Sequence, residues 1–447
     1  MLPARISHWY RTFFSIEEVG QSQTLQWFLG AMLFFFFLTF HRFISSASTT
    51  LEAAQTGGGT CWPYFQDCAQ LFTLSGLPHG YSYTTFHMVL YAVMLYIVYL
   101  IWKKAWAHAH FLMLVLWLWK MFVIFVLSYT LAGPYDYYHV ILTAILLFIP
   151  FKLYFLKLTF VFLYFMSATP KFDETWVLGS YFTAMKTGLP LFPDALTPFF
   201  SNAVIFMQVV GCWFLLSSRT LLRHVALGIL VFFHLYSGIL VLYLYPSIAL
   251  PPLLILFGPL YRHTPIPFEK KALWGWFIIL LVALFQVLGF VVPGDRRVTL
   301  ESNRFGMYMF EANHQCVATV RIYESGKRVA SSTTESLACT GFFCLTQTKT
   351  YMEDGLAITE ARHESASAWN RCDPYEWWSR LNYRCERDAA VKRIALQFDH
   401  SVNGAPFYRI VDVPDICDIE YRPFVHNPWI HEPPEARLVG YPVENIY

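Results

Sequence analysis

The stretch VFLYFMSATPKFDETWVLG, residues 161–179, joins an aromatic, membrane-type segment to a polar turn. Lys171 follows the Ser-Ala-Thr-Pro turn at once, with Asp173, Glu174 and Trp176 just behind it. One interpretation is an interfacial anchor, because lysine snorkels and tryptophan prefers the headgroup layer. If this helix end is instead buried in protein, desolvation disfavours the ammonium and makes Lys171 a usable base, an effect that the two carboxylates oppose.

The composition on either side of this stretch is that of a membrane protein. The 447 residues are 56% hydrophobic and 19% aromatic, and 14% are charged, against roughly 25% in soluble domains. More than half of the charged residues follow Pro293. We therefore expect a transmembrane domain over residues 1–293, in contact with membrane lipids, and a second domain over residues 294–447. A net charge of +2 without basic, aromatic-interleaved tracts argues against nucleic acid as a partner.

The apolar part predicts a polytopic α-helical protein with about nine spans, its N-terminus inside and its C-terminus outside. Basic residues in short turns, such as Lys103 and Lys104, set this orientation through the positive-inside bias. The run over residues 138–168 would make one helix of about 46 Å, longer than a bilayer core of about 30 Å. We interpret it as two spans with a bend near Pro150, and a single tilted, kinked helix is the alternative. The other helices are expected at 25–40, 85–102, from 108 onward, and at 199–217, 222–245, 247–260 and 272–292.

The cysteines agree with this orientation. An even set of eight falls on the predicted outer side, in the loop over residues 45–84 and in the last domain, and predicts disulfides in oxidising surroundings. The candidates are Cys61, Cys68, Cys316, Cys339, Cys344, Cys372, Cys385 and Cys417, and the spacing suggests a bond between the first two. Zinc is the rival explanation, but no paired CxxC spacing is present, so we predict no metal.

The last domain has the pattern of a β-rich, disulfide-stapled fold. CVATVRIYE at 316–324 and RIALQFDHS at 393–401 alternate in the way that strands do, between turn residues. A helix is expected around residues 373–393, and the proline-rich end over 427–447 is expected to be extended. The sequence thus predicts a mainly β, extracytoplasmic domain.

Histidines in apolar segments are further candidates. His139 and His234 are intramembrane ionisable residues, which usually face an interior or a cavity, although a hydrogen-bonded core histidine is the alternative for each. His108 and His110 are interpreted as part of the basic cytoplasmic turn. Aromatic helices suit a quinone-sized pocket, and the same aromatic stripes also serve simple packing.

Three stretches carry a family resemblance. YFMSATPKFDETWVLG at 164–179 resembles the core signature of vitamin K-dependent gamma-glutamyl carboxylases and their bacterial relatives, the horizontally transferred transmembrane (HTTM) domain proteins; Lys171, Asp173, Trp176 and Gly179 match its spacing. FFHLYSG at 232–238 resembles the family's later Phe-His helix, and NRFGMYMFEANHQCVATVRIYESGK at 303–327 resembles the start of its lumenal β domain. The resemblance extends from the first helix to roughly residue 412.

The resemblance implies an activity. In that family, oxygenation of reduced vitamin K drives removal of a γ-proton from glutamate, and the carbanion adds CO2. It implies Lys171 as the base, His139 as the assisting histidine, His234 and Trp176 at the cofactor, reduced vitamin K or menaquinone as that cofactor, and an exported peptide as substrate. Exclusion of water protects a neutral amine and a strongly basic alkoxide.

The chain also departs from the animal enzymes. It has Pro170-Lys171 where they have two lysines, Ala168 or Thr169 where they have a glycine, and a shorter C-terminal part. These differences favour a bacterial-type member in an inner membrane. The alternative function is a non-catalytic HTTM-fold subunit or assembly partner of a larger membrane complex, because a fold does not fix an activity. A transporter is the third hypothesis, disfavoured because no duplicated half-chain pattern is present.

Overall fold

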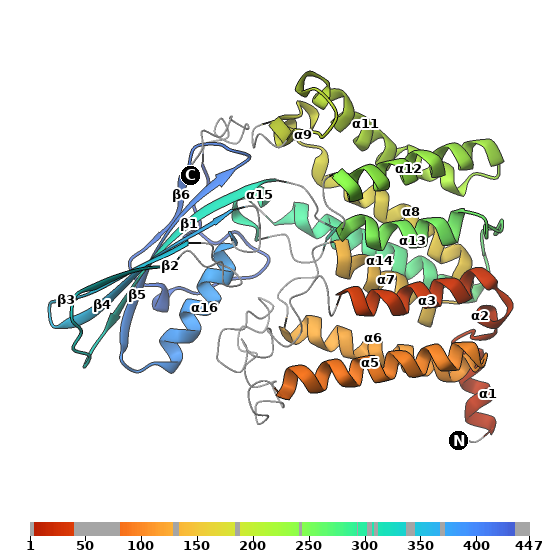
Figure 1. The fold of residues 1–447 in the computed structure, drawn as a ribbon, viewed down its shortest axis with the longest axis horizontal. Coiled ribbons are helices and arrows are strands. Elements are labelled where there is room, and N and C mark those ends of the chain that lie inside the picture. The colour runs from red at the N-terminus through yellow and green to blue at the C-terminus, as the bar shows by residue number, and fades with distance from the viewer. Residues whose placement is uncertain are drawn as a thin grey trace.

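The protein has a helical part and a sheet that lies at one end of it, as the computed structural model in Figure 1 shows. The structure describes residues 4–39, 81–127, 134–183, 188–240, 244–292, 294–301, 306–307, 312–336, 345–366 and 372–433, and the statements below concern these.

Apolar helices occur where the sequence predicts them. They are α3 (Gln23–Phe37), α5 (Tyr81–Trp102), α6 (Trp106–Leu127), α7 (Pro134–Phe148), α8 (Lys152–Ala168), α11 (Thr197–Val209), α12 (Thr220–Leu240), α13 (Leu244–Phe257) and α14 (Leu273–Val291). Four helical segments, at 152–171, 194–216, 220–240 and 270–291, are long and apolar enough to cross a membrane. One predicted span differs in detail, since α11 ends before Gly211 and a tighter 3-10 helix, Gly211–Leu216, completes it.

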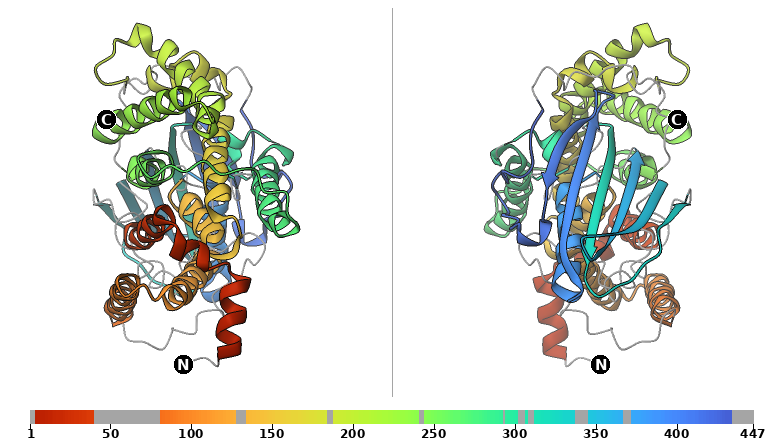
Figure 2. Two further views of the ribbon diagram at one scale, coloured as in Figure 1. Left: turned by 90° about the vertical axis from the view of Figure 1, so that its right-hand side faces the viewer. Right: turned by 90° about the vertical axis from the view of Figure 1, so that its left-hand side faces the viewer.

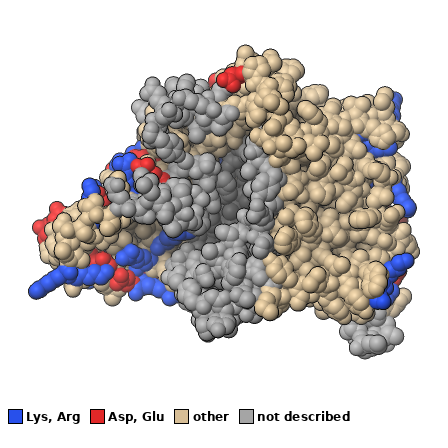
Figure 3. Space-filling view, in the orientation of Figure 1, with Lys and Arg blue, Asp and Glu red and all other residues tan. Residues whose placement is uncertain are grey.

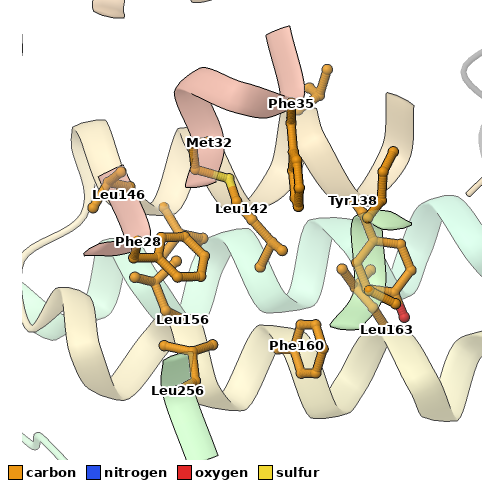
Figure 4. Close-up of a cluster of buried hydrophobic side chains, with 14 of the residues drawn as sticks. Phe28, Met32, Phe35, Tyr138, Leu142, Leu146, Leu156, Phe160, Leu163 and Leu256 are labelled. Carbon is orange, nitrogen blue, oxygen red and sulfur yellow. The ribbon is translucent and has the colours of Figure 1, made fainter. Parts of the chain in front are cut away.

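The core of the helical part lies where α3, α7, α8 and α13 meet. Figure 4 shows side chains from these four helices converging, with Met32 and Phe35 of α3 over Leu142 of α7, and Phe160 of α8 below them. All four side chains are fully buried. Interdigitated packing of this kind holds helices together whether water or lipid surrounds them, because it rests on dispersion contacts.

The apolar run over residues 138–168 is two helices, α7 and α8, as predicted. Pro150 separates them, and Phe151 adopts a left-handed conformation with φ 57°. The turn is held from a distance, because the carboxylate of Glu18 accepts hydrogen bonds from the backbone N–H groups of Phe151 (2.9 Å) and Lys152 (2.8 Å). Glu18 belongs to the short helix α2 (Glu17–Gln21), so the N-terminal segment caps α8.

Replacing Glu18 by Gln is expected to lower stability by about 2 kcal/mol, because a charged acceptor of two helix N–H groups is lost. Glu17→Gln is the matched control, since that exposed neighbour contacts only Arg11 at the surface and such pairs contribute little. Thermal unfolding of the purified protein in detergent measures both. Equal melting temperatures for the two variants would show that the Glu18 cap does not contribute to the stability of the protein.

The C-terminal part is one antiparallel sheet, in agreement with the predicted β-rich domain. Its strands are β1 (His314–Glu324), β2 (Ser332–Ser336), β3 (Leu345–Glu353), β4 (Leu356–Ala366), β5 (Val391–Val402) and β6 (Tyr408–Val413), in the order β2-β3-β4-β1-β5-β6. Buried and half-buried residues alternate strictly along β1, and helix α16 (Pro374–Arg387) packs near β5. Figure 2 shows the broad face of this sheet in its right-hand view.

Two disulfides staple the sheet to its surroundings. Cys316 on β1 bonds Cys372 just before α16, and Cys385 on α16 bonds Cys417, with Cα–Cα distances of 5.6 and 5.7 Å. Four of the predicted disulfide cysteines are thus paired. The other four, Cys61, Cys68, Cys339 and Cys344, lie outside the described residues.

His110 corrects one interpretation. It is buried, not part of an exposed turn: its Nδ1 lies 2.8 Å from the Tyr10 hydroxyl and its Nε2 lies 3.0 Å from the carbonyl of Leu147. It thereby links the first helix, α1 (Ala4–Phe13), to the end of α7. His108, two residues earlier, is exposed as expected, because a helix turns by about 100° per residue.

Candidate functional site

Lys171 lies at the end of α8, in a 3-10 turn formed by Thr169–Lys171. Its side chain is buried, with 1% exposed, and Nζ donates a hydrogen bond to the carbonyl of Ser167. The ring of Trp176, itself buried, has its centroid 5.5 Å from Nζ. The lysine is therefore enclosed in protein, and the interpretation as an interfacial anchor does not fit.

The two neighbouring carboxylates differ in their surroundings. Asp173 caps the short helix α9 (Glu174–Val177), since its Oδ1 accepts from the backbone N–H (2.9 Å) and hydroxyl (2.5 Å) of Thr175. Its Oδ2 accepts from the guanidinium of Arg297. Glu174 is exposed. The carboxylate of Asp173 is therefore engaged by Thr175 and Arg297, and that of Glu174 faces solvent.

Asp173 belongs to a joint between the helical part and the sheet. We use "the joint" for three contacts: Asp173 with Arg297 of α15 (Arg296–Thr299), Thr175 with Asn403, and Tyr181 with Asn313. The side-chain amide of Asn403 donates to the Thr175 hydroxyl at 3.3 Å, and that of Asn313 donates to the Tyr181 carbonyl at 2.8 Å. The quoted stretch thus carries two of the three contacts, and Tyr181 follows it closely.

Gly179 and Trp176 also have structural roles. Gly179 has φ 77°, and a Cβ there would lie 3.0 Å from the backbone nitrogen of Pro198, so only glycine fits without strain. Trp176 stacks on Tyr181 with ring centroids 5.0 Å apart. Three of the four residues that match the family spacing, these two and Asp173, are therefore explained by the fold alone.

The Asp173–Arg297 pair is expected to hold the sheet in place. Because both side chains are less than a fifth exposed, Asp173→Asn should cost about 1 to 3 kcal/mol and speed amide hydrogen exchange in α15 and at the start of β1. A double-mutant cycle with Arg297→Gln isolates the pair. Glu360→Gln, which breaks the more exposed pair with Arg321, is the control and should leave exchange at the joint unchanged. Additive effects in the cycle would contradict the pairing.

His139 lies in a separate, buried polar cluster. Lys120 of α6 contacts three groups with Nζ: the Nδ1 of His139 at 2.8 Å, the hydroxyl of Thr39 at 2.9 Å and Oδ1 of Asp136 at 2.6 Å. An ammonium only donates, so Nδ1 accepts and the proton of the neutral imidazole is on Nε2. The backbone of Met32 is a further hydrogen-bond partner of the imidazole, and the ring centroid of Phe36 lies 4.3 Å from that of the imidazole at a steep angle.

Lys120 was missed by the sequence analysis. Its signal is plain in retrospect, since it is the one acidic or basic residue in the otherwise apolar run LMLVLWLWKMFVIF. An ionisable residue in the middle of such a helix needs a buried partner. The structure brings Lys120, Asp136 and His139 together, and Lys171 is not among the partners of His139.

His234 lies in a third cluster with tyrosines. Its Nε2 is hydrogen-bonded to the hydroxyl of Tyr164, and its ring lies 5.3 Å from that of Tyr245. The Tyr245 hydroxyl lies 3.1 Å from that of Tyr138. All four side chains are buried. Trp176, predicted with His234 at the cofactor, is not among its contacts and instead lies beside Lys171.

A pair of histidines lies at the joint end of the sheet. His314 starts β1 beside Asn313, and His400 lies on β5; their rings stack with Nδ1 and Nε2 3.0 Å apart, fully buried. Burial lowers the pKa of His400 to about 4, against smaller opposing effects of the Val298 backbone and Asp295. Burial, and then the neighbouring His400, lower the pKa of His314.

The sheet is expected to lose stability as pH falls from about 6.5 towards 4. A histidine whose pKa is lowered by folding binds its proton in the unfolded state first, so the loss begins at the unfolded value of about 6.5 and ends near the folded value of His400, about 4. Thermal melts between pH 7 and pH 5 test this. His400→Gln should flatten the dependence, and a wild-type profile without a slope in that window would contradict it.

The described residues hold no group of three or more His, Cys, Asp or Glu side chains that could bind a metal ion. Comparisons with protein-family models, with curated proteins and with solved structures found no match to this chain. The resemblance to the carboxylases therefore remains a prediction carried by the quoted residues and by the positions that they take up.

Proposed function

We propose that this chain is an integral membrane enzyme resembling the vitamin K-dependent gamma-carboxylases, in which Lys171 takes a proton from a reduced quinone. The hydroquinone, reduced vitamin K or menaquinone, supplies the oxygenation chemistry when bound. The substrate is an exported peptide or small molecule at the sheet side of the membrane. The proposal rests on the sequence resemblance together with the surroundings of Lys171 in the structure.

One observation carries the proposal: Lys171 is enclosed in protein, with 1% of it exposed, and the carboxylate of Asp173 is engaged by Thr175 and Arg297. An amine kept from water meets one condition for a base, whereas a headgroup anchor would be exposed. Arg297 has a part in this, because it engages the carboxylate of Asp173 that would otherwise compete for the lysine.

In this proposal His139 is the assisting histidine, and it lies in the separate cluster with Lys120 and Asp136. Lys120 with Asp136 fixes the ring of His139 and its tautomer, in which the proton is on Nε2. Lys120 and Asp136 are therefore positioning residues for His139, and they add to the residues implied by the family resemblance.

The membrane placement is part of the proposal: about nine spans, N-terminus inside, and the sheet outside the inner membrane of a bacterium. Helices α12 and α14 support lipid contact, because only 22% of the residues in their most apolar windows are buried. Lys and Arg side chains line the edge of Figure 3 that lies opposite the sheet, which fits a cytoplasmic face. Disulfides at the sheet end fit oxidising surroundings.

Incorporation of labelled CO2 tests the activity, with the purified protein in detergent, reduced vitamin K or menaquinone, and a Glu-containing peptide. Lys171→Ala is expected to lower the rate at least about 100-fold, the usual scale for a lost general base. Lys103→Ala is the control, as that exposed lysine lies at the end of α5. A Lys171→Ala protein that melts like the wild type and still carboxylates would contradict the role of Lys171.

A non-catalytic subunit or assembly partner is the second candidate. It is favoured by the structural roles of Asp173, Trp176 and Gly179, which need no chemistry. This function predicts no incorporation by the wild-type protein and co-purification of stable partner subunits from the native membrane. The same assay therefore separates the two candidates.

A further inference from the structure

A cationic site lies at the end of the helical part that is farthest from the sheet. Arg223, in the first turn of α12, and Lys157 of α8 both lie over the ring of Tyr261, which follows α13. The guanidinium carbon is 3.8 Å from the ring centroid and the ammonium nitrogen is 4.1 Å from it. Two helices distant in sequence thus place two cations on one aromatic ring.

These two cations lack a counter-charge in the described part of the chain. Arg223 is 8% exposed and donates one long hydrogen bond, 3.5 Å, to the carbonyl of Ser217, while its Nε is buried without a partner. Lys157 is 2% exposed and donates to the carbonyl of Arg262. A cation–π contact gains about 1 to 2 kcal/mol, less than the several kcal/mol that burying an unpaired ion costs.

An adjacent cleft has room for the missing anion. It has a volume of about 400 Å³ and is lined by Arg223, His224, Leu227, Gly258, Pro259 and Tyr261. The start of α12, a helix of 21 residues, lies at the same place, so its positive end adds to the field. Arg223 presents a planar fork of donors, which matches two oxygens of a phosphate group.

We propose that this cleft binds a phosphate group, through the Arg223 guanidinium with Lys157 and the Tyr261 ring behind it. The source is either an anionic phospholipid headgroup or a free phosphate, which share this chemistry. Figure 3 shows basic side chains at the edge that lies opposite the sheet in Figure 1, where a headgroup layer would lie if the helices cross a membrane. The site is independent of any catalysis at Lys171.

The experiment uses the full-length protein and two probes. In detergent, the melting temperature is compared in inorganic phosphate and in chloride of equal ionic strength. In lipid nanodiscs, it is compared between phosphatidylcholine alone and phosphatidylcholine with phosphatidylglycerol, and native mass spectrometry counts the lipid retained after extraction. Stabilisation by phosphatidylglycerol alone identifies a headgroup, and stabilisation by phosphate identifies a free anion. If neither stabilises the wild type, the proposal is wrong.

Variants locate the effect. Arg223→Gln is expected to weaken binding of the effective probe about tenfold, equivalent to about 1.4 kcal/mol. Arg219→Gln removes the same charge from an exposed residue four positions earlier, with no contact to Tyr261, and should change affinity less than twofold, on the scale of a screened surface charge. Equal losses in the two variants would overturn the site, because only the general surface charge would then matter. If Arg223→Gln does not fold, the two comparisons on the wild-type protein, with Arg219→Gln beside them, still show whether a phosphate group binds.

Discussion

The contact between Asp173 and Arg297 connects the two halves of this protein. It ties the turn after α8 to the short helix that precedes the sheet, and it is reinforced by the amides of Asn313 and Asn403. The same contact occupies the carboxylate nearest in sequence to Lys171. One ion pair thus contributes both to the orientation of the sheet and to the charge environment near the lysine.

The elements of the fold were largely predictable because they depend on local patterns. Apolar runs located the helices, alternation located β1 and β5, and Pro150 located the break between α7 and α8. The partner that holds that break was not predictable, because Glu18 lies more than one hundred residues away and its sequence neighbours give no sign of it. Local sequence determines where an element ends, and tertiary contacts determine what caps it.

The candidate site was predictable in its members and not in its grouping. His139 and His234 were singled out as ionisable residues in apolar segments, Lys171 as a lysine at the end of one, and Trp176 through the family resemblance; all four are buried. The structure places them in three separate groups, because each polar group satisfies itself with the nearest neighbour across a helix interface. Lys120 for His139, Tyr164 for His234 and Ser167 for Lys171 are such neighbours, and periodicity cannot pair them.

The four residues that match the family spacing, Lys171, Asp173, Trp176 and Gly179, differ in how far the fold explains them. Gly179 is required by a left-handed turn, Asp173 by a helix cap and an arginine, and Trp176 by a stacked tyrosine, and these roles persist whether or not the protein is an enzyme. A buried lysine differs, since an apolar side chain of similar length would pack there without the cost of removing an amine from water. The amine at position 171 is the part of the signature that proton transfer from a hydrophobic cofactor would use. The enzyme hypothesis and the structural one therefore separate at this residue.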